Sequence, residues 1–377
     1  MIPMAVPDAT RTDWASAQLM VDASTFFDQL LEAINRARHS VDLEYYIFAL
    51  DSVGERFIEA MGAAAARGVR VRLLVDGVGS AAGSETLAQR LFELGVAVQI
   101  YHPLPWLTGS YRWSVSRGGW LLKFLSFLLN LNRRNHRKLC LIDGERAWVG
   151  SLNISSDHLA REQGGKGWRD YALALRGRGV ESLQKGFERL WSARDPRFHR
   201  GFFHSYLSNR SNRARRLKNR FLSDSVRDAG SRVWIVSAYF APTGPLRREL
   251  LSAAKRGVDV CLLLPEHSDV AIFPGLSSHY YRELLRSGAR IFLYQPGVLH
   301  AKAVLLDDLA ILGSSNLNYR STLHDLELDV LVDSPETVSE LRRLIQLDRE
   351  SSRELLLEHT PPPRLLDWLW YLLRYWM

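Results

Sequence analysis

The sequence predicts an α/β protein of two lobes, each an α/β/α sandwich, related by an approximate twofold axis. Two observations predict this fold: an internal repeat, and the alternation of strand-like with helix-like segments. Four blocks of the first half recur in the same order in the second half, which constrains the architecture more than any single propensity. The paired blocks are residues 41–48 with 233–240, 67–76 with 256–265, 94–103 with 287–296, and 136–153 with 300–316.

Helical patterns separate the short β-branched runs. They cover residues 26–38, 56–66, 246–255 and 280–286, the first after a Thr25-x-x-Asp28 capping signal. Strands that alternate with helices predict parallel βαβ units.

The same comparison of the halves gives the expected domain organisation. We expect a first lobe over residues 1–196 with an insertion at 104–135, a basic linker over 197–220, and a second lobe over 221–377. The linker prediction rests on eight Lys or Arg and no acid between residues 197 and 220. This segment is interpreted as either a solvated surface or an anion-binding patch.

Composition restricts the class of protein. The 377 residues are 46% hydrophobic, which suits a large core and excludes a disordered or fibrous chain. The net charge of +8 favours an anionic partner: nucleic acid, an anionic membrane or a phosphorylated small molecule. The N-terminal residues 1–13 lack the apolar segment of a secretory signal, so a cytosolic start is expected.

Cysteine usage indicates neither a disulfide framework nor a metal site. Cys140 and Cys261 lie in apolar strand-like runs, where a thiol acts as a small hydrophobic filler. No C-x-x-C pair and no H-E-x-x-H helix occurs in the sequence. We therefore predict no metal and no cofactor.

A His-x-Lys-x4-Asp motif occurs once in each half and is followed by Gly-Ser-x-Asn. On a strand, His and Lys two residues apart share one face and can converge on one anion, whereas the Asp has the opposite parity and is expected to anchor the strand end. The later Ser and Asn can return a hydroxyl and an amide donor to the site. The motif residues are His136, Lys138, Asp143, Ser151 and Asn153, and then His300, Lys302, Asp307, Ser314 and Asn316.

This set of side chains fits phosphodiester chemistry. Lys and Asn donors can surround the non-bridging oxygens while one neutral imidazole attacks phosphorus and the other, protonated, assists the leaving alcohol. The covalent phosphohistidine then passes its phosphoryl group to water or to an alcohol. Each ring needs a carboxylate on its other nitrogen. Glu327 is the candidate after the second motif and Asp170 its counterpart in the first half, with Asp325 as a competing choice.

The paired motifs resemble those of the phospholipase D superfamily and, within it, of the bacterial cardiolipin synthases. The resemblance covers residues 41 to about 332 and is most detailed over residues 299–321. It implies that His136 is the nucleophile, that His300 is the general acid/base, and that no metal is required. It also implies phosphate ligands at Lys138, Lys302, Asn153 and Asn316. The sequence departs from the family's Asn-x-Glu pattern at residues 324–327.

Two segments favour a membrane lipid as the substrate. Residues 120–134, inside the insertion, and 365–377, at the C-terminus, both have helical amphipathic patterns rich in aromatic residues. The first is too short to cross a bilayer. Packing on the protein itself is the alternative for each. With the basic charge, these segments predict peripheral attachment to the cytoplasmic side of the membrane.

The expected function is phosphatidyl transfer from a second phospholipid to phosphatidylglycerol. A phospholipase D that hydrolyses phospholipids is the alternative. A nuclease of the same superfamily, holding a sugar-phosphate backbone on residues 197–220, ranks lower because that run lacks an aromatic stacking platform, so nucleic acid is not an expected partner. A membrane-binding protein without activity is a third alternative. The sequence leaves the oligomeric state open.

Overall fold

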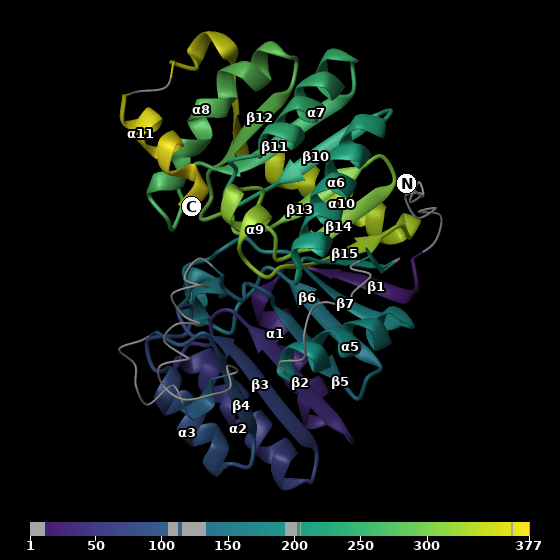
Figure 1. Ribbon diagram of the computed structural model, residues 1–377, viewed down its shortest axis with the longest axis vertical. Helices are drawn as coiled ribbons and strands as arrows, with labels where there is room; N and C mark the ends of the chain where they lie inside the picture. Colours follow the sequence, from purple (N-terminus) through teal and green to yellow (C-terminus); the bar gives the residue numbers. More distant parts are fainter. Residues whose placement is uncertain are drawn as a thin grey trace.

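Two sheets, one in each lobe, organise the chain in the computed structural model, which describes residues 12–104, 112–114, 133–192, 202–203, 205–362 and 365–376. The lobes lie one above the other along the long axis of the molecule (Figure 1). The two-lobed α/β fold predicted from the repeat is confirmed.

The sheet of the first lobe has the strand order β1-β7-β6-β5-β2-β3-β4. Its strands are β1 (Trp14–Met20), β2 (Ser40–Tyr45), β3 (Arg70–Asp76), β4 (Ala97–Tyr101), β5 (Leu139–Ile142), β6 (Arg146–Gly150) and β7 (Ala172–Gly177). The sheet of the second lobe has the order β16-β12-β11-β10-β13-β14-β15-β9-β8. Its strands are β8 (Phe202–Phe203), β9 (Tyr206–Ser208), β10 (Arg232–Val236), β11 (Asp259–Pro265), β12 (Arg290–Tyr294), β13 (Ala303–Leu306), β14 (Leu309–Gly313), β15 (Leu328–Val332) and β16 (Ser352–Leu355).

Helices cover both faces of each sheet. The helices of the first lobe are α1 (Ala23–Asn35), α2 (Ser52–Ala66), α3 (Ser84–Glu93) and α5 (Gly179–Trp191). Those of the second lobe are α6 (Asn212–Asp228), α7 (Gly244–Lys255), α8 (Ile272–Arg286), α9 (Tyr319–Leu323), α10 (Pro335–Glu350) and α11 (Leu365–Leu373). The predicted helices are present, but α1 begins earlier than expected because the side chain of Asp22, rather than Thr25, caps it by accepting from the Thr25 N–H.

The sheets are mixed, so the prediction of parallel βαβ units is correct for only part of each. Strands β2, β3 and β4 pair in parallel, as do β10, β11 and β12. The motif strands β5 and β13 are antiparallel to their neighbours because each turns directly into the next strand. Asp143 and Asp307 lie in these tight turns with φ of +55° and +45°. Such a hairpin joins only antiparallel strands.

Three buried apolar clusters form the core. One joins α1, α2 and α3 to the first sheet, and another joins α6, α7 and α8 to the second. The third is shared: it contains the α5 face of the first sheet and the α10 face of the second. Cys140 and Cys261 are buried free thiols in strands β5 and β11, as predicted.

The expected basic linker is largely part of the second lobe. Strand β9 pairs with β15, and α6 begins at Asn212, where the Ser211 side chain accepts from the Ala214 N–H. Pairing with β15 and burial of the α6 face hold this segment against the sheet. The highly charged segment is therefore a partly buried strand and helix of the second lobe rather than an exposed linker.

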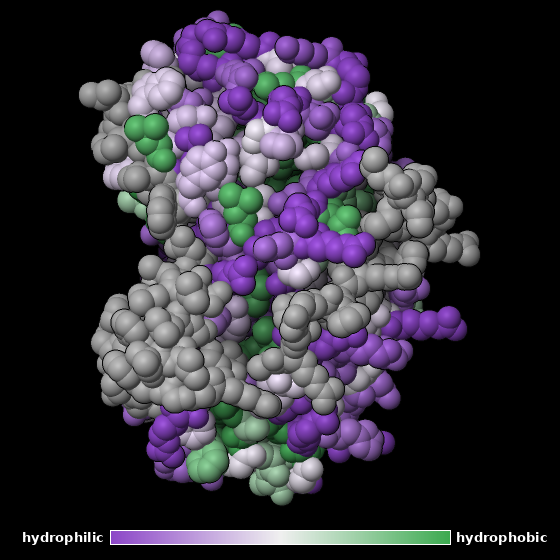
Figure 2. All heavy atoms as spheres, in the orientation of Figure 1, coloured by the Kyte–Doolittle hydropathy of each residue, from purple (hydrophilic) through white to green (hydrophobic). Residues whose placement is uncertain are grey.

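The C-terminal amphipathic segment forms α11, which packs on α8. Tyr371 stacks on His279 with 3.9 Å between ring centroids, and Trp370 and Tyr371 pack against the second lobe's core. Trp368 and Leu372 remain 49% and 67% exposed. The helix thus has one protein-facing side and one apolar outward side, and Figure 2 shows an apolar spot over α11 on a mostly hydrophilic face.

No helix within the described ranges is both long and apolar enough to cross a bilayer. Most of the insertion at 104–135, including residues 120–132, lies outside the described residues.

Candidate active site

Reciprocal backbone bonds between the lobes bring the two motifs together. The His136 N–H donates to Leu326 O at 2.9 Å, and the His300 N–H donates to Arg169 O at 2.8 Å. Leu326 and Arg169 each precede one of the candidate orienting carboxylates. The same bridge, made twice, places each carboxylate beside the histidine of the other lobe.

The ring of His136 is held entirely by the second lobe. Its Nδ1 lies 3.2 and 3.3 Å from the two carboxylate oxygens of Glu327, and 3.1 Å from the carbonyl oxygen of Ser314. Glu327 also accepts hydrogen bonds from the hydroxyls of Ser314 (2.5 Å) and Ser321 (2.7 Å). Asp325, the competing candidate, instead accepts from the Arg134 N–H and pairs with Arg320.

The ring of His300 is held by the first lobe. Its Nδ1 lies 2.7 Å from Asp170 Oδ1, which also accepts from the Ser151 hydroxyl at 2.6 Å. The second carboxylate oxygen lies 2.6 Å from Nδ1 of His158. The Nε2 of His158 accepts the backbone N–H of Asn153 at 3.0 Å. Asp170 is therefore shared between two imidazoles.

These contacts assign the proton to Nδ1 on both motif rings and leave Nε2 as the nitrogen with a lone pair. Burial and the charge of Lys138 lower the pKa of His136 to about 4. Burial and the charge of Lys302 lower the pKa of His300 as well. Burial opposes the ionisation of Glu327, but His136 lowers its pKa to about 2. Neutral rings therefore face ionised carboxylates at neutral pH.

The motif lysines are buried cations with weakened proton affinity. Burial and the charge of Lys302 lower the pKa of Lys138 to about 7, and burial lowers the pKa of Lys302 to about 8. Each ammonium donates to the carbonyl oxygen of its own motif histidine, at 2.8 Å for Lys138 and 2.5 Å for Lys302. Two mutually repelling ammonium groups are poised for an anion that would neutralise them.

The motif asparagines are buried beside these groups. The Oδ1 of Asn153 accepts from the Ile47 N–H at 3.2 Å, so Nδ2 is the end of this amide that can donate to a phosphate oxygen. The Oδ1 of Asn316 has no hydrogen-bond partner among the described residues. Tyr46 and Trp168 complete the surroundings, their rings 4.9 Å from His136 and 5.1 Å from His300.

Four predicted site residues have structural contacts instead of reaching a substrate. Asp143 and Asp307, grouped with the motif's catalytic residues but expected from their parity to anchor the strand ends, lie at the far ends of strands β5 and β13. Asp143 accepts backbone N–H groups of residues 38–40, and Asp307 those of residues 230–232. Ser151 and Ser314, expected to bind substrate, are fully buried and donate to the orienting carboxylates. The anchoring contacts of the Asp follow from its opposite parity, and the complete burial of the Ser explains the correction to its expected role.

His158 and Ser321 hold the second oxygen of each carboxylate and were not predicted from the sequence. A signal for both exists, because each lies five residues after the motif asparagine of its own half. The equal spacing is not evident from the sequence because one residue is a histidine and the other a serine.

His158, Asp170 and His300 place potential metal-ligating atoms within 4.8 Å of one another. Those atoms are Nδ1 of each ring and the carboxylate oxygens, and they are already joined by hydrogen bonds. A cation here would have to displace both Nδ1 protons, so the residues do not fit a metal ion well.

The basic segment at residues 197–220, the candidate surface for a nucleic acid, has cationic side chains that point into the second lobe. Lys218 pairs with Asp329 at 2.6 Å, and Arg215 donates to the carbonyl oxygen of His324 at 3.0 Å. Both side chains are buried. These two cations serve the second lobe's own packing.

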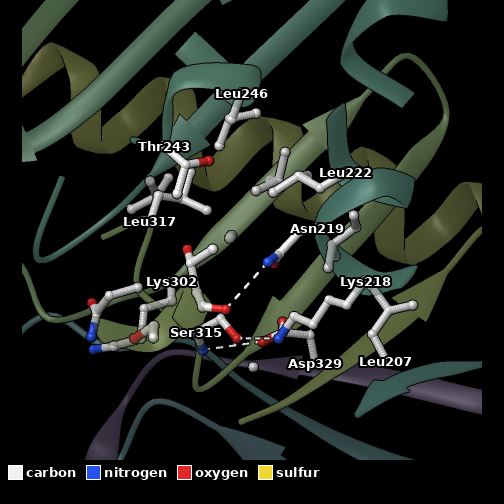
Figure 3. A pocket seen from close by; sticks show the side chains of 18 residues that line it. Leu207, Lys218, Asn219, Leu222, Thr243, Leu246, Lys302, Ser315, Leu317 and Asp329 are labelled. Atoms are coloured by element: carbon white, nitrogen blue, oxygen red, sulfur yellow. Dashed lines mark hydrogen bonds and ion pairs between the residues drawn. The ribbon is translucent and has the colours of Figure 1, made fainter. Parts of the chain in front are cut away.

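An apolar recess adjoins the site in the second lobe, between the sheet and helices α6 and α7. Lys302 and Asn316 belong to its lining, which also contains Leu222, Leu246 and Leu317. Figure 3 shows these leucines on the opposite side of the recess from Lys302 and Ser315. The recess thus combines two of the predicted phosphate ligands at one edge with hydrocarbon walls.

Comparisons with known proteins find relatives along most of this chain. A family described as "Cardiolipin synthase, PLD-like domain" matches residues 30–191 and 222–348. Cardiolipin synthase A of Pseudomonas fluorescens is 31% identical over 91% of this chain and 70% of its own length. Cardiolipin synthase 1 of Bacillus anthracis is 30% identical over 93% of this chain and 69% of its own.

Solved structures share the fold at low identity. Phosphatidylserine synthase of Haemophilus influenzae matches with a TM-score of 0.71 and 13% identity, over 96% of this chain and 95% of that one. Polyphosphate kinase of Porphyromonas gingivalis matches with a TM-score of 0.57 and 15% identity, over 94% of this chain and 54% of that one. At these identities the likeness concerns the fold.

Proposed function

The chain belongs to the phospholipase D-like family of cardiolipin synthases, and from this premise we propose that it transfers a phosphatidyl group from one phospholipid to phosphatidylglycerol through a phosphohistidine. The observation that carries the proposal is the reciprocal arrangement of His136 with Glu327 and His300 with Asp170. Two rings with protonated Nδ1 can each present Nε2 to one phosphorus atom from opposite sides.

In the first step Nε2 of His136 attacks phosphorus and the bond to the donor's headgroup oxygen breaks. His300 is neutral in the empty site, and the charge of the bound phosphodiester favours its protonated form. That form gives its proton to the headgroup oxygen, so a neutral alcohol departs. Lys138, Lys302, Asn153 and Asn316 stabilise the charge on the non-bridging oxygens.

In the second step neutral His300 removes the proton from a hydroxyl of phosphatidylglycerol. The resulting oxygen attacks phosphorus, the bond to His136 breaks, and both rings return to their starting state. Glu327 and Asp170 remain ionised throughout and stabilise the imidazolium forms of the two histidines.

A lipid substrate suits the surroundings better than a nucleic acid. The apolar recess shares Lys302 and Asn316 with the phosphate-binding groups, which fits a phosphate joined to hydrocarbon. The inward Lys218 and Arg215 are not disposed as a track for a sugar-phosphate backbone.

Attachment to the membrane surface is part of the proposal. On helix α11 Leu372 is 67% exposed, Trp368 is 49% exposed although one edge of its ring contacts His279, and Tyr375, just beyond the helix, is 48% exposed. Aromatic and aliphatic side chains on one outward side of a helix are typical of an element that lies in the bilayer interface.

The test is incubation of the purified protein with phosphatidylglycerol vesicles, followed by identification of the products. We expect cardiolipin and glycerol in equal amounts, and an acid-labile phosphoprotein that His136→Ala abolishes. Phosphatidic acid without cardiolipin would contradict the transferase proposal in favour of hydrolysis. A phosphoprotein of equal yield in His136→Ala and His300→Ala would overturn the assigned roles.

A further inference from the structure

We propose that His158 is a positioning residue for the acid/base half of the reaction: it fixes Asp170 against His300 and, through its other nitrogen, fixes the backbone of Asn153. This inference rests on the proposed roles of His300 and Asn153. It adds a function for a histidine that lies outside the paired motifs.

Both ring nitrogens of His158 are committed, which defines its state. Because Nε2 accepts the Asn153 N–H, that nitrogen carries no proton, and the proton resides on Nδ1. Nδ1–H therefore donates to Asp170 Oδ2 at 2.6 Å. A neutral, single-tautomer imidazole thus connects the orienting carboxylate to the segment that carries a phosphate ligand.

The two halves differ at this position. Ser321 is the equivalent residue, and its hydroxyl donates to the second oxygen of Glu327 at 2.7 Å. A serine there can support the carboxylate but does not reach back to the motif asparagine through a second ring atom. The rings also differ: His300 makes one 2.7 Å bond to Asp170, whereas His136 lies 3.2 and 3.3 Å from both oxygens of Glu327.

This asymmetry matches a difference in role. A general acid must direct its proton accurately, which favours a ring held by one short bond to a carboxylate that cannot rotate. With three donors, Asp170 is fixed at both oxygens by Ser151, His158 and His300.

The second donor also limits the basicity of Asp170. A donor on Oδ2 spreads the carboxylate's charge, so Asp170 stabilises the imidazolium of His300 less than it would alone. The groups facing His300 are Asp170, His158 and Lys302, and Lys138 acts on Asp170 from across the site. Loss of the His158 donor should therefore move the deprotonation of His300 to higher pH.

Three substitutions separate the two contacts. His158→Asn can keep a donor where Nδ1 lies but loses the acceptor for Asn153. His158→Gln can place its Oε1 near the Nε2 position to accept from Asn153 but loses the donor to Asp170. His158→Phe loses both, and Ser321→Ala is the matched control in the other half.

The measurement is the pH dependence of kcat with a water-soluble phosphodiester. We expect His158→Phe and His158→Gln to lower kcat about 10- to 100-fold, as removal of an orienting partner does elsewhere, and to move the alkaline limb upward. His158→Asn should keep the limb of the native protein. Ser321→Ala should leave that limb unchanged.

Equal losses in all three His158 variants with an unaltered pH profile would show simple packing and overturn the proposal. A spectrum of the native protein labelled with ¹⁵N-histidine gives an answer even if the variants do not fold or turnover is absent. It must show His158 neutral with the proton on Nδ1, and a charged ring or the other tautomer would overturn the proposal. Failure to make cardiolipin would count against the proposed transfer to phosphatidylglycerol and would leave the role of His158 untouched.

Discussion

Glu327 and Asp170 determine which nitrogen of each motif histidine carries a proton, and each acts across the boundary between the lobes. A carboxylate on Nδ1 leaves Nε2 free and stabilises the imidazolium that forms during proton transfer. In the proposed mechanism, the chemistry at phosphorus therefore depends on two side chains that do not touch it.

Glu327→Gln should remove most of the activity. The amide keeps the size of the side chain but loses the charge and can favour the wrong tautomer of His136, which costs about 10⁴-fold in kcat in the serine protease triad. We expect a fall of about 10² to 10⁴-fold in kcat, measured with a soluble phosphodiester. Asp325→Asn is the matched control, because Asp325 contacts Arg134 and Arg320; a similar loss there would contradict the assignment.

The lysines predict the alkaline side of the pH profile. The pKa values of Lys138 and Lys302 are lowered to about 7 and about 8, so in the empty enzyme both ammonium groups lose their charge as pH rises through this range. We expect kcat/KM to fall there because an uncharged amine binds the phosphate poorly. A bound anion raises both pKa values, so the lysines should not limit kcat in this pH range. Identical limbs in the two profiles would refute this explanation.

The sequence predicted the residues of the site better than their contacts. The two His-x-Lys pairs and the carboxylates Glu327 and Asp170 lie together, but each carboxylate contacts the histidine of the other lobe, which the repeat did not indicate. The partners of Ser151 and Ser314 were not predictable, because whether a hydroxyl faces a substrate or a buried carboxylate depends on how the lobes meet. His158 was not predicted because its equivalent position in the second half is Ser321, and a motif defined by residue type does not align a histidine with a serine.

At the scale of elements, tight turns rather than the sheet face determine where the motif strands end. Asp143 and Asp307 have left-handed φ values and accept several backbone N–H groups from a neighbouring loop. Burial would raise the pKa of each carboxyl, but the N–H donors lower it. Each Asp therefore ties the end of a motif strand to the start of the adjacent strand.

Asp143→Ala should destabilise the fold by about 1–3 kcal/mol, because it leaves several N–H donors unpaired. Asp143→Asn should cost less, since an amide oxygen accepts hydrogen bonds and Asn tolerates positive φ. The depressed pKa stabilises the fold above the unfolded value of about 3.9, and this advantage is lost as pH falls below it. Urea unfolding at pH 7 and pH 3 measures the difference; a cost that persists undiminished at pH 3 would contradict the role of the charge.

Helix α11 predicts a separation of binding from chemistry. Leu372→Asp places a charge on the exposed side of the helix and removes about 1.5–3 kcal/mol of apolar burial at the interface, equivalent to roughly 10- to 100-fold in vesicle affinity. Turnover of a short-chain soluble diester should be unchanged. Leu347→Asp is the control, because Leu347 is 42% exposed on α10, away from α11. Equal effects of the two substitutions on vesicle binding would show that α11 does not lie in the membrane interface.

The sequence located most helices and strands but not their pairing. Periodicity is a local property, so α2, α7 and the parallel strands followed from it. The antiparallel motif hairpins depend on turns at Asp143 and Asp307, and the pairing of β9 with β15 depends on contacts far apart in sequence. The basic composition of residues 197–220 concealed this strand because charge was read as exposure.

At the scale of the whole molecule, the active site and the inner core both belong to two lobes at once. The inner apolar cluster contains Phe187 of α5 from the first lobe and Leu341 of α10 from the second. The orienting carboxylates cross the same boundary. A lobe that unfolded separately would therefore expose part of this core and release both motif rings.

This arrangement predicts one cooperative unfolding transition. Phe187→Ala should cost about 3–5 kcal/mol, typical of a buried aromatic truncated to alanine, and should lower the stability of both lobes together. Calorimetry should show a single peak at a lower temperature. Hydrogen exchange should accelerate alike in β5 and β13, with activity lost over the same interval. Two separated peaks, or protection retained in β13 while β5 exchanges, would show lobes that fold independently and an inner cluster too weak to couple them.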